Sequence, residues 1–427
     1  MKRGYKVRWR CSNMSNDIQP EIRFPGFTEA WEQRKFECLL DKKDGVRRGP
    51  FGSALKKEFF VSNSNFVVYE QQNAIYDNYE TRYKITEKKY NELIKFKLEP
   101  GDFIMSGAGT IGRISRVPKQ IKPGVFNQAL IRLRINKEIT DSEYFIQFIR
   151  ADFMQRKLTG ANPGSAITNL VPMSEVKKWI VQFPILEEQK KIGNFFKQLD
   201  DTIALQQRKL DLLKETKKGF LQKMFPKNGA KVPEIRFPGF TEDWEQRKFK
   251  EFSKKTGKKN TKDLDFPAYS VSNKAGLISQ TEQFDGSRLD DLEKTNYKFV
   301  EPNEFAYNPA RVNVGSIAFN NLGMTVIVSS LYVVVKMSED LDNEFILQFI
   351  KSPTFIKEVK RNTEGSVREY LFYENFANIK FPFTRNKEEQ QKIGAFFKQL
   401  DDTIALHQRK LDLLKETKKG FLQKMFV

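Results

Sequence analysis

The sequence predicts an α+β protein with an internal pseudo-two-fold repeat, in which two globular mixed α/β domains are separated by two long helices that form an antiparallel coiled coil. Three observations support this fold class. The chain has 427 residues, more than one hydrophobic core usually organises. Two segments occur twice with almost no change. The longer of them has the apolar spacing of a helix, whereas the regions between the repeats mix short β-rich runs with helical stretches.

The repeated segments bracket each half of the chain. The run PEIRFPGFTEAWEQRKF at 20–36 returns at 233–249 with one substitution, and the run at 187–225 returns at 388–426 with three. The three differences are Lys190/Gln391, Asn194/Ala395 and Gln206/His407. The chain therefore consists of two copies of one unit.

The regions between the repeated segments are not alike. Residues 37–186 and 250–387 share little beyond length and general pattern. A constant frame around two unlike inserts suits a scaffold that presents two different domains to two different targets. The predicted parts are an N-terminal tail at 1–19, with Met14 as an alternative start; a first domain with its leader at 20–186; a helix at 187–225; a linker at 226–232; a second domain with its leader at 233–387; and a second helix at 388–427.

Each long repeated segment is expected to form one helix. Its apolar residues recur at alternating steps of four and three, which is the spacing of a coiled-coil seam. Gln206 and Lys217 are polar interruptions of the first seam, and His407, the only histidine, replaces the glutamine in the second. We expect the two seams to pack on each other; alternatively, each helix packs only on its own domain. The seam residues are Ile192, Phe196, Leu199, Ile203, Leu210 and Leu213 in the first helix, and Ile393, Phe397, Leu400, Ile404, Leu411 and Leu414 in the second.

Composition indicates a nucleic-acid partner. The chain has 74 Lys and Arg against 54 Asp and Glu, and the resulting net charge of +20 is typical of a protein that binds a polyanion. A basic surface that is merely solvated is the alternative. Two cysteines, Cys11 and Cys38, provide neither a disulfide framework nor a cysteine zinc site, which fits the cytoplasm. No apolar run approaches the roughly 20 residues that span a bilayer, and none resembles a secretory signal.

The residues exclude several kinds of catalysis. The single histidine, His407, lies in the predicted helical seam, which argues against a catalytic triad that uses histidine and against a histidine metal site. The phosphate-binding pattern GxxxxGK[ST] is absent, as is the pattern of amino-methyltransferases, an Asn or Asp followed by two prolines and an aromatic residue. A carboxylate nuclease site stays open, although no acidic cluster is repeated in both halves.

A glycine-rich run in the first domain has an equivalent in the second. GDFIMSGAGTIGRISRV at 101–117 formally matches a dinucleotide fingerprint, but we reject that match because no helix follows the glycines and no acidic residue lies about 20 positions on. A tight turn that lets the backbone approach DNA, with Arg113 and Arg116 behind it, is the functional interpretation, and a plain hairpin is the alternative. YNPARVNVGSIAF at 307–319 is the corresponding strand-turn-strand.

Candidate DNA contacts follow from side-chain chemistry. One Arg side chain can form two hydrogen bonds with the edge of a guanine, and one Asn or Gln side chain can form two with the edge of an adenine. The basic pair at Arg47 and Arg48 is expected at phosphates or on bare surface instead. The regional candidates are Arg47, Arg48, Gln71, Gln72, Asn73, Ser106, Gly107, Thr110, Arg113, Arg116, Ser165, Thr168 and Asn169 in the first domain, and Asn308, Arg311, Asn313, Ser366 and Arg368 in the second.

These features together resemble one known family. The leader PEIRFPGFTE-W, the helix EEQKKIGNFFKQLDDTIALQQRKLDLLKETKKGFLQKMF, the glycine turn and the duplicated layout resemble Type I restriction enzyme specificity subunits over the whole chain after about Met14. The resemblance implies two target-recognition domains that bind the halves of a bipartite double-stranded DNA site. It also implies a non-catalytic chain that holds no metal or cofactor of its own.

The same resemblance implies partners. Two modification subunits would dock on the repeated frame and use S-adenosylmethionine for adenine methylation, and restriction subunits would add cleavage that depends on ATP and Mg. Two other classes compete with this interpretation. A stand-alone regulatory DNA-binding protein would not require two unlike domains on a duplicated frame. A coiled-coil scaffold would not require a net charge of +20.

Overall fold

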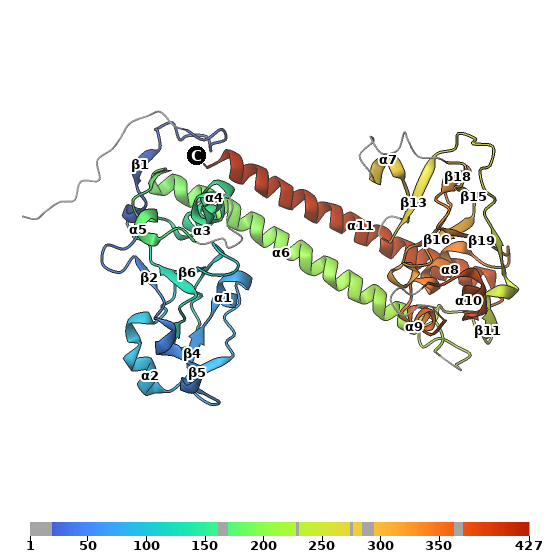
Figure 1. The fold of residues 1–427 in the computed structure, drawn as a ribbon, viewed down its shortest axis with the longest axis horizontal. Coiled ribbons are helices and arrows are strands. Elements are labelled where there is room, and N and C mark those ends of the chain that lie inside the picture. Colours follow the sequence, from blue (N-terminus) through green and yellow to red (C-terminus); the bar gives the residue numbers. More distant parts are fainter. Residues whose placement is uncertain are drawn as a thin grey trace, which may run out of the picture. The chain divides into compact units, whose positions relative to one another are not determined.

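The computed structural model describes residues 19–160, 170–227, 230–273, 276–283, 294–362 and 370–426, and the chain forms two compact units (Figure 1). Unit 1 contains the chain as far as Leu205 and the segment from Leu411 onward, and unit 2 contains the chain from Gln206 to Lys410. Each unit therefore consists of one variable domain, the first part of the long helix that follows it, and the last part of the other long helix.

Domain 1, the variable domain of unit 1, contains two four-stranded sheets. One sheet has the strand order β2-β9-β6-β7 with antiparallel neighbours, and the other has the order β3-β5-β4-β8, in which β4 and β8 are parallel. The strands are β2 Val46–Arg48, β3 Phe60–Val61, β4 Phe66–Tyr69, β5 Tyr83–Ile85, β6 Phe103–Ser106, β7 Ile114–Arg116, β8 Gly124–Phe126 and β9 Leu130–Leu133. The helices are α1 Gln71–Tyr76, α2 Glu87–Glu92, α3 Ser142–Arg150, α4 Asp152–Thr159 and α5 Met173–Val176.

Domain 2, the variable domain of unit 2, repeats this plan. Its sheets have the orders β12-β19-β16-β17 and β14-β13-β18-β15, and β13 and β18 are again the parallel pair. The strands are β12 Ser253–Thr256, β13 Ala268–Ser272, β14 Gly276–Ser279, β15 Lys298–Val300, β16 Glu304–Tyr307, β17 Ile317–Phe319, β18 Val326–Val328 and β19 Val333–Met337. The helices are α7 Gln280–Gln283, α8 Asn343–Ile350, α9 Pro353–Asn362 and α10 Tyr373–Asn378. Two domains of dissimilar sequence thus share one fold.

The repeated leader closes each domain. Its strand β1 Glu32–Lys35 pairs antiparallel with β10 Ile180–Phe183, and in unit 2 β11 Glu245–Lys248 pairs in the same way with β20 Lys380–Phe383. Trp31 and Trp244 are buried beside these strands. The leader arginines Arg23 and Arg236 form ion pairs with the fully buried carboxylates of Glu188 and Glu389, at 2.7 and 2.6 Å. The near-identity of the two leaders therefore preserves the same closure twice.

The two repeated segments form long helices, α6 Leu186–Lys223 and α11 Lys387–Lys424. Within unit 2 the helices are antiparallel, because Lys217 contacts Asp401 while Gln206, earlier in α6, contacts His407, later in α11. The antiparallel pairing predicted from the seams is confirmed within each unit. In unit 1, Phe195 packs edge-on against Phe421 and Lys418 contacts Asp200.

The alternative packing is also partly present. The first turns of each helix belong to the core of the domain that precedes it, since Ile192 and Phe196 are buried with Phe145 of α3, and Ile393 and Phe397 with the corresponding α8 residue Phe345. Leu210 and Leu411, at the middle of the seams, are buried as predicted. The helix stripe therefore packs on its own domain at one end and on the other helix elsewhere.

Candidate nucleic-acid interface

The glycine turn of domain 1 is a β-hairpin between β6 and β7. Strand β7 follows the glycines directly, which agrees with rejecting a dinucleotide site. Gly109 and Gly112 have φ angles of +64° and +77°, a backbone conformation that favours glycine. A Cβ at Gly112 would lie 2.7 Å from the side-chain oxygen of Gln155, so this turn also packs tightly against α4.

Three loops of domain 1 meet at this hairpin. The Gly107 backbone N–H donates to the carbonyl of Ala129 at 2.7 Å, and the side-chain amide of Gln71 donates to the carbonyl of Ala108. The Gly49 N–H donates to the carbonyl of Leu130 at 3.0 Å. The loop after β2, the turn after β8 and the start of α1 thus form one edge with the hairpin. We call this the reading edge of domain 1.

The predicted candidates at this edge differ in availability. Arg48, Gln72, Thr110 and Arg113 are exposed. Gln71 is half-buried and holds the hairpin through Ala108. Gly107 is half-buried and can offer only backbone. The first four residues are therefore the side chains of the predicted set that DNA could reach without rearrangement.

Two predicted contacts have structural roles that oppose the prediction. Asn73 is completely buried, where its side chain caps α1 through the Glu70 N–H and donates to the carbonyls of Asn78 and Glu80. Ser106 is also completely buried, and its hydroxyl accepts from the Arg113 N–H at 3.0 Å. In this conformation neither side chain can reach a base, so both predictions are corrected.

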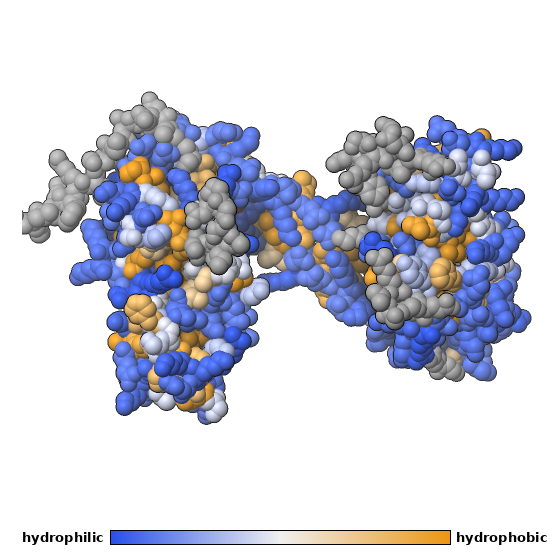
Figure 2. All heavy atoms as spheres, in the orientation of Figure 1, coloured by the Kyte–Doolittle hydropathy of each residue, from blue (hydrophilic) through white to orange (hydrophobic). Residues whose placement is uncertain are grey.

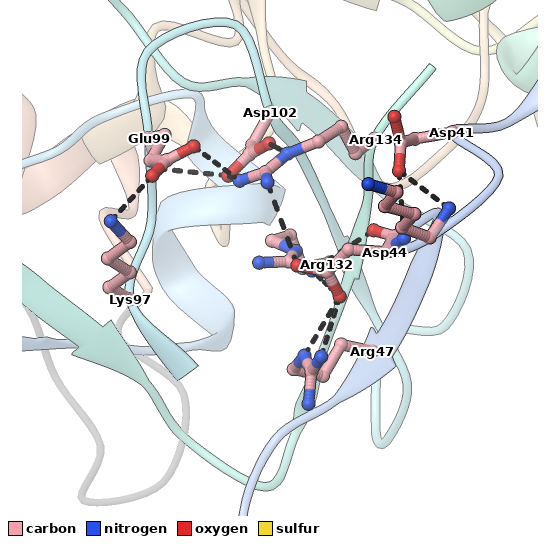
Figure 3. A network of polar contacts seen from close by, with 9 residues as sticks. Asp41, Asp44, Arg47, Lys97, Glu99, Asp102, Arg132 and Arg134 are labelled. Atoms are coloured by element: carbon pink, nitrogen blue, oxygen red, sulfur yellow. Dashed lines mark hydrogen bonds and ion pairs between the residues drawn. The ribbon is translucent and has the colours of Figure 1, made fainter. Parts of the chain in front are cut away.

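Two predicted arginines already have carboxylate partners. Arg116 contacts Glu143 at 2.7 Å. Arg47 contacts Asp44 at 2.7 Å within a larger charged network (Figure 3). Burial works against ionisation of Asp44, but hydrogen bonds from Arg132 and Arg47 outweigh it and hold its pKa below the usual value. Arg47 is therefore already paired with Asp44, which Arg132 of β9 also contacts, whereas Arg48 is exposed.

The same network fixes the strand that leads into the hairpin. Arg134 binds the buried carboxylate of Asp102, just before β6, through two nitrogens at 2.7 and 3.0 Å (Figure 3). The paired hydrogen bond to Asp102 raises the pKa of Arg134 further above its usual range. The network is thus a rigid support for the reading edge, and it offers little free charge to a ligand.

In domain 2 the equivalent hairpin joins β16 to β17 through a short 3-10 helix, Val312–Val314. Arg311 is exposed, whereas Asn308 and Asn313 are half-buried. The Asn308 side chain accepts from the Ala310 N–H at 3.0 Å. The remaining candidates, Ser165, Thr168, Asn169, Ser366 and Arg368, lie outside the described residues.

Sequence reasoning missed the turn that follows the parallel strand pair. In domain 1 this turn carries Asn127 and Gln128, and it is closed by a 3.1 Å hydrogen bond from the Leu130 N–H to the Asn127 carbonyl. In domain 2 the turn carries Ser329 and Ser330, followed by Leu331, and the Tyr332 N–H closes it onto Ser329 at 3.0 Å. One backbone frame therefore presents unlike side chains in the two domains.

Two exposed apolar side chains accompany these turns. Phe51, in the loop after β2, is 89% exposed, and Leu331 of domain 2 is 74% exposed. Gly52, next to Phe51, lies so close to Gln128 that an added Cβ would be 2.7 Å from its side-chain oxygen. Phe51 therefore belongs to the reading edge. Neither position has a sequence signal of its own, because composition alone does not distinguish an exposed Phe or Leu from a core residue.

The helices carry a duplicated polar contact. In unit 1, Asp200 accepts from Lys418 at 2.6 Å and from Gln147 of α3 at 2.9 Å. In unit 2, Asp401 accepts from Lys217 at 2.6 Å and from Gln348 of α8 at 3.1 Å. Burial lowers the pKa of Lys217, although attraction to Asp401 opposes that shift. Lys217, which interrupts the apolar seam, is thus a specific link between the helices and the domain.

The helices also expose leucines at equivalent positions, and apolar surface is visible along them in Figure 2. Leu205 and Leu212 of α6 are 51% and 68% exposed, and Leu406 and Leu413 of α11 are 63% and 68% exposed. Among the described residues no group of three His, Cys, Asp or Glu could hold a metal ion. The described helices also include none that is long and apolar enough to cross a membrane.

Comparison with known sequences gives the same family for both halves. A family profile described as the Type I restriction modification DNA specificity domain matches residues 52–215 and 241–416. The MjaX specificity subunit of Methanocaldococcus jannaschii, a type I restriction enzyme subunit by its name, is 23% identical over 79% of this chain and 80% of that protein. The type I restriction enzyme MjaVIII specificity subunit of the same organism is 23% identical over 70% of this chain and 73% of that protein.

Solved structures share the fold. The S subunit of a Type I restriction-modification system from M. genitalium has a TM-score of 0.60 at 14% identity, over 96% of this chain and 99% of that one. A chain from a structural study of type I R-M complex assembly has a TM-score of 0.52 at 16% identity, over 93% and 97% of the two chains. Because the family profile matches both repeats and most of the chain, the protein belongs to the Type I restriction-modification DNA specificity family and is a non-catalytic DNA-specificity subunit.

Proposed function

We propose that domain 1 and domain 2 each bind one half of a bipartite double-stranded DNA site. The observation that carries this proposal is the shared backbone frame with unlike side chains. Asn127 and Gln128 in domain 1 correspond to Ser329 and Ser330 in domain 2, on turns closed by the same hydrogen bond. Amide side chains can pair with adenine edges. Serine hydroxyl groups offer other hydrogen bonds, and leucine offers apolar contact. Two domains of one fold would therefore read two different sequences.

Specific residues are assigned to this role in each domain. In domain 1 the proposed base contacts are Gln72, Thr110 and Gln128, with Phe51 available for apolar contact with a base. Arg48 is assigned to a phosphate. In domain 2 the proposed contacts are Arg311, Ser330 and Leu331. All of these side chains lie on or next to the turns and hairpins described above.

Exchange of the variable regions tests the proposal. Replacing residues 250–387 by the equivalent region of a relative should change one half of the methylated motif and leave the other half intact, because each domain is a separate folded unit. Methylome sequencing of host DNA before and after the exchange provides the measurement. The matched control replaces residues 37–186 and should change only the other half. A change in both halves after either exchange contradicts the modular assignment.

A finer exchange tests the turn itself. Asn127, Gln128 and Ala129 would be replaced together by Ser, Ser and Leu, the residues of the domain 2 turn. The fold should persist because both turns have the same closing hydrogen bond. The preference of the first half-site should weaken or shift, by about 1–3 kcal/mol for each lost base contact. An unchanged motif and unchanged affinity would remove this turn from the reading edge.

We further propose that two copies of a modification subunit dock on α6 and α11. The exposed leucines occur at equivalent positions of the two helices, so the chain presents the same apolar surface twice. Identical surfaces predict two identical partners, and leucine replaced by a polar residue at one of them should remove one copy only. Leu212→Gln and Leu413→Gln are mirror controls for each other, and Lys209→Gln is a surface control on α6. Native mass spectrometry of the complex measures the number of bound subunits. Retention of both copies in the double variant would contradict this docking surface.

Cofactors are assigned to the partners. We propose that the modification subunits use S-adenosylmethionine and that restriction subunits use ATP and Mg, while this chain directs both to the DNA site. The full chain alone should neither methylate nor cut target DNA, and activity should appear on adding the partner subunits. Methyl transfer by the isolated chain, measured with labelled S-adenosylmethionine, would contradict the assignment.

A further inference from the structure

A cavity of about 320 Å³ opens in unit 1 beside the hairpin of domain 1. Its walls come from α1, the end of the glycine turn, the α3–α4 junction and the last part of α11. The first three belong to the variable domain, whereas the α11 segment belongs to the repeated frame. Constant and variable parts of the subunit therefore line the same cavity.

The cavity carries excess positive charge. Its cationic side chains are Arg113, Arg150, Lys415, Lys418 and Lys419, and its carboxylates are Asp77 and Asp152. Two of the cations are engaged, since Arg150 donates to the Ile114 carbonyl at 3.0 Å and Lys418 donates to Asp200 at 2.6 Å. Arg113, Lys415 and Lys419 are exposed and form no ion pair with any other described residue. Three cations are thus available to an anion from outside.

The cavity adjoins the reading edge directly. The glycine turn contributes Gly112 and Arg113 to the cavity, and a few residues earlier Ala108 accepts from the Gln71 side chain at the reading edge. Helix α1 also spans both places, because it begins at Gln71 and lines the cavity with Ala74 and Ile75. A DNA strand whose bases meet the reading edge would therefore bring its backbone to the cavity.

We propose that Arg113, Lys415 and Lys419 bind a phosphodiester group of the DNA backbone next to the half-site that domain 1 reads. The inference rests on the proposed function of domain 1. Lys415 and Lys419 are four residues apart in α11, so they lie on one face of the helix. Phosphate contacts fix the position of DNA but carry no base identity. The frame helix would thus set the position of the DNA relative to domain 1 without altering the sequence that is read.

The salt dependence of DNA binding tests the proposal. The full chain is titrated against a duplex containing the methylated motif, with fluorescence anisotropy as the readout, at several KCl concentrations. Each lost phosphate contact lowers the slope of log affinity against log salt by about 0.9. Lys415→Gln with Lys419→Gln should therefore reduce the slope by up to about 0.9, the value for one phosphate, so that a fourfold rise in salt weakens binding by up to about 3.5-fold less than in the wild type. The preference for the motif over a scrambled duplex should stay unchanged.

Two control variants separate a local contact from a general loss of charge. Lys178→Gln with Lys190→Gln removes the same charge from exposed lysines of unit 1 outside the cavity, and its slope should match the wild type. Lys415→Arg with Lys419→Arg should retain the wild-type slope, because the cations are kept. Phosphate ethylation interference should map the lost contact beside the first half-site.

The outcomes are distinguishable. An unchanged slope in Lys415→Gln with Lys419→Gln, or an equal fall in the control, overturns the phosphate site. An unchanged slope combined with weaker binding of modification subunits assigns the cavity to an acidic protein surface and likewise overturns it. If the wild type shows no preference for its motif, the proposed function of domain 1 fails and this inference fails with it. A wild type with clear preference and a slope that does not respond to the substitution leaves the function standing and removes only the phosphate site.

Discussion

Substitution of one glycine in each long helix probes how the variable domain is fixed to the frame. An added Cβ at Gly193 of α6 would lie 2.6 Å from the backbone nitrogen of Tyr144 and 2.8 Å from a carboxylate oxygen of Asp141. Asp141 caps α3 by accepting from the backbone N–H groups of Glu143 and Tyr144. Contact with backbone cannot be relieved by a change of side-chain rotamer. Gly193→Ala must therefore displace the start of α3 from α6.

The expected magnitude follows from three contributions. Alanine favours a helix over glycine by about 1 kcal/mol. Against this, overpacking of a tight contact costs about 1–3 kcal/mol and a weakened N-cap about 1 kcal/mol. The free energy of unfolding of unit 1 should thus fall by about 1–3 kcal/mol. Gly394→Ala should have a comparable effect in unit 2, where the Cβ would lie 2.8 Å from a carboxylate oxygen of Asp342 and 2.9 Å from the backbone nitrogen of Phe345.

The same helices provide the control. Apart from its chain neighbours and the adjacent helix backbone, no described atom lies within 4 Å of a Cβ built at Gly219 of α6, so Gly219→Ala should stabilise the helix by up to about 1 kcal/mol. Urea unfolding of the full chain and hydrogen exchange of the α3 amides measure the global and local effects. Gly193→Ala should lower protection of α3, whereas Gly219→Ala should not. Equal stability of the two variants would refute the contact and the reasoning built on it.

Two further predictions concern the helix pair and its polar link. Leu210→Pro or Leu411→Pro should disrupt the helix pair at a buried position, at a cost of about 3 kcal/mol or more, while each variable domain stays folded. Native mass spectrometry of the complex should show lost assembly, or methylome sequencing should show a changed half-site spacing. Unchanged assembly and spacing would show that the helices do not set the spacing. Gln147→Ala should leave Asp200 with Lys418 alone and loosen α3 from α6 by about 1 kcal/mol, detectable as faster hydrogen exchange in α3, with Gln348→Ala as the equivalent change in unit 2.

Local and periodic signals predicted much of the fold. The step pattern of the 39-residue repeat predicted a helix from 187 to 225, close to the observed Leu186–Lys223, because a long apolar period outweighs local propensity. Short β-rich runs were predicted between the repeats, and strand β4 at Phe66–Tyr69 is one of them; the predicted hairpin at the glycines joins β6 to β7. Pairings between distant segments had no such signal. The parallel pair of β4 and β8 brings Val67 to Gly124, and nothing in either run identifies the partner.

Candidate contacts were harder to predict than the fold, for a physical reason. Asn73 and Asn127 have the same side chain, and both side chains accept from a backbone N–H, yet Asn73 is completely buried whereas Asn127 is half-buried in a turn at the reading edge. Polar residues stabilise backbone ends as readily as they bind ligands, and only the folded surroundings decide between these roles. Lys415 and Lys419 had no sequence signal at all, because their position beside Arg113 depends on antiparallel packing of helices from different halves of the chain.

The repeat also predicts that half of the chain can replace the whole. Unit 1 draws only on residues as far as Leu205 and on the segment from Leu411 onward. The second segment has a copy in α6, since 210–225 and 411–426 are identical. A fragment from Met14 to about Lys231 contains both sequences. Two fragments could therefore rebuild unit 1 twice. The identical lysines of α6 would take the place of Lys418, which contacts Asp200, and of Lys424, whose carbonyl accepts from the Ile22 N–H.

The differences between the helices do not oppose this exchange. The residues that differ at 391 and 395 are exposed, and at the third position a glutamine would replace His407 opposite Gln206. A two-fold dimer would carry two copies of domain 1 in opposite orientations, so with modification subunits it should methylate an interrupted palindrome made of the first half-site. Analytical ultracentrifugation and methylome sequencing test the two steps separately. A fragment that stays monomeric at micromolar concentration refutes the pairing, and a dimer that methylates a non-palindromic site refutes the symmetry.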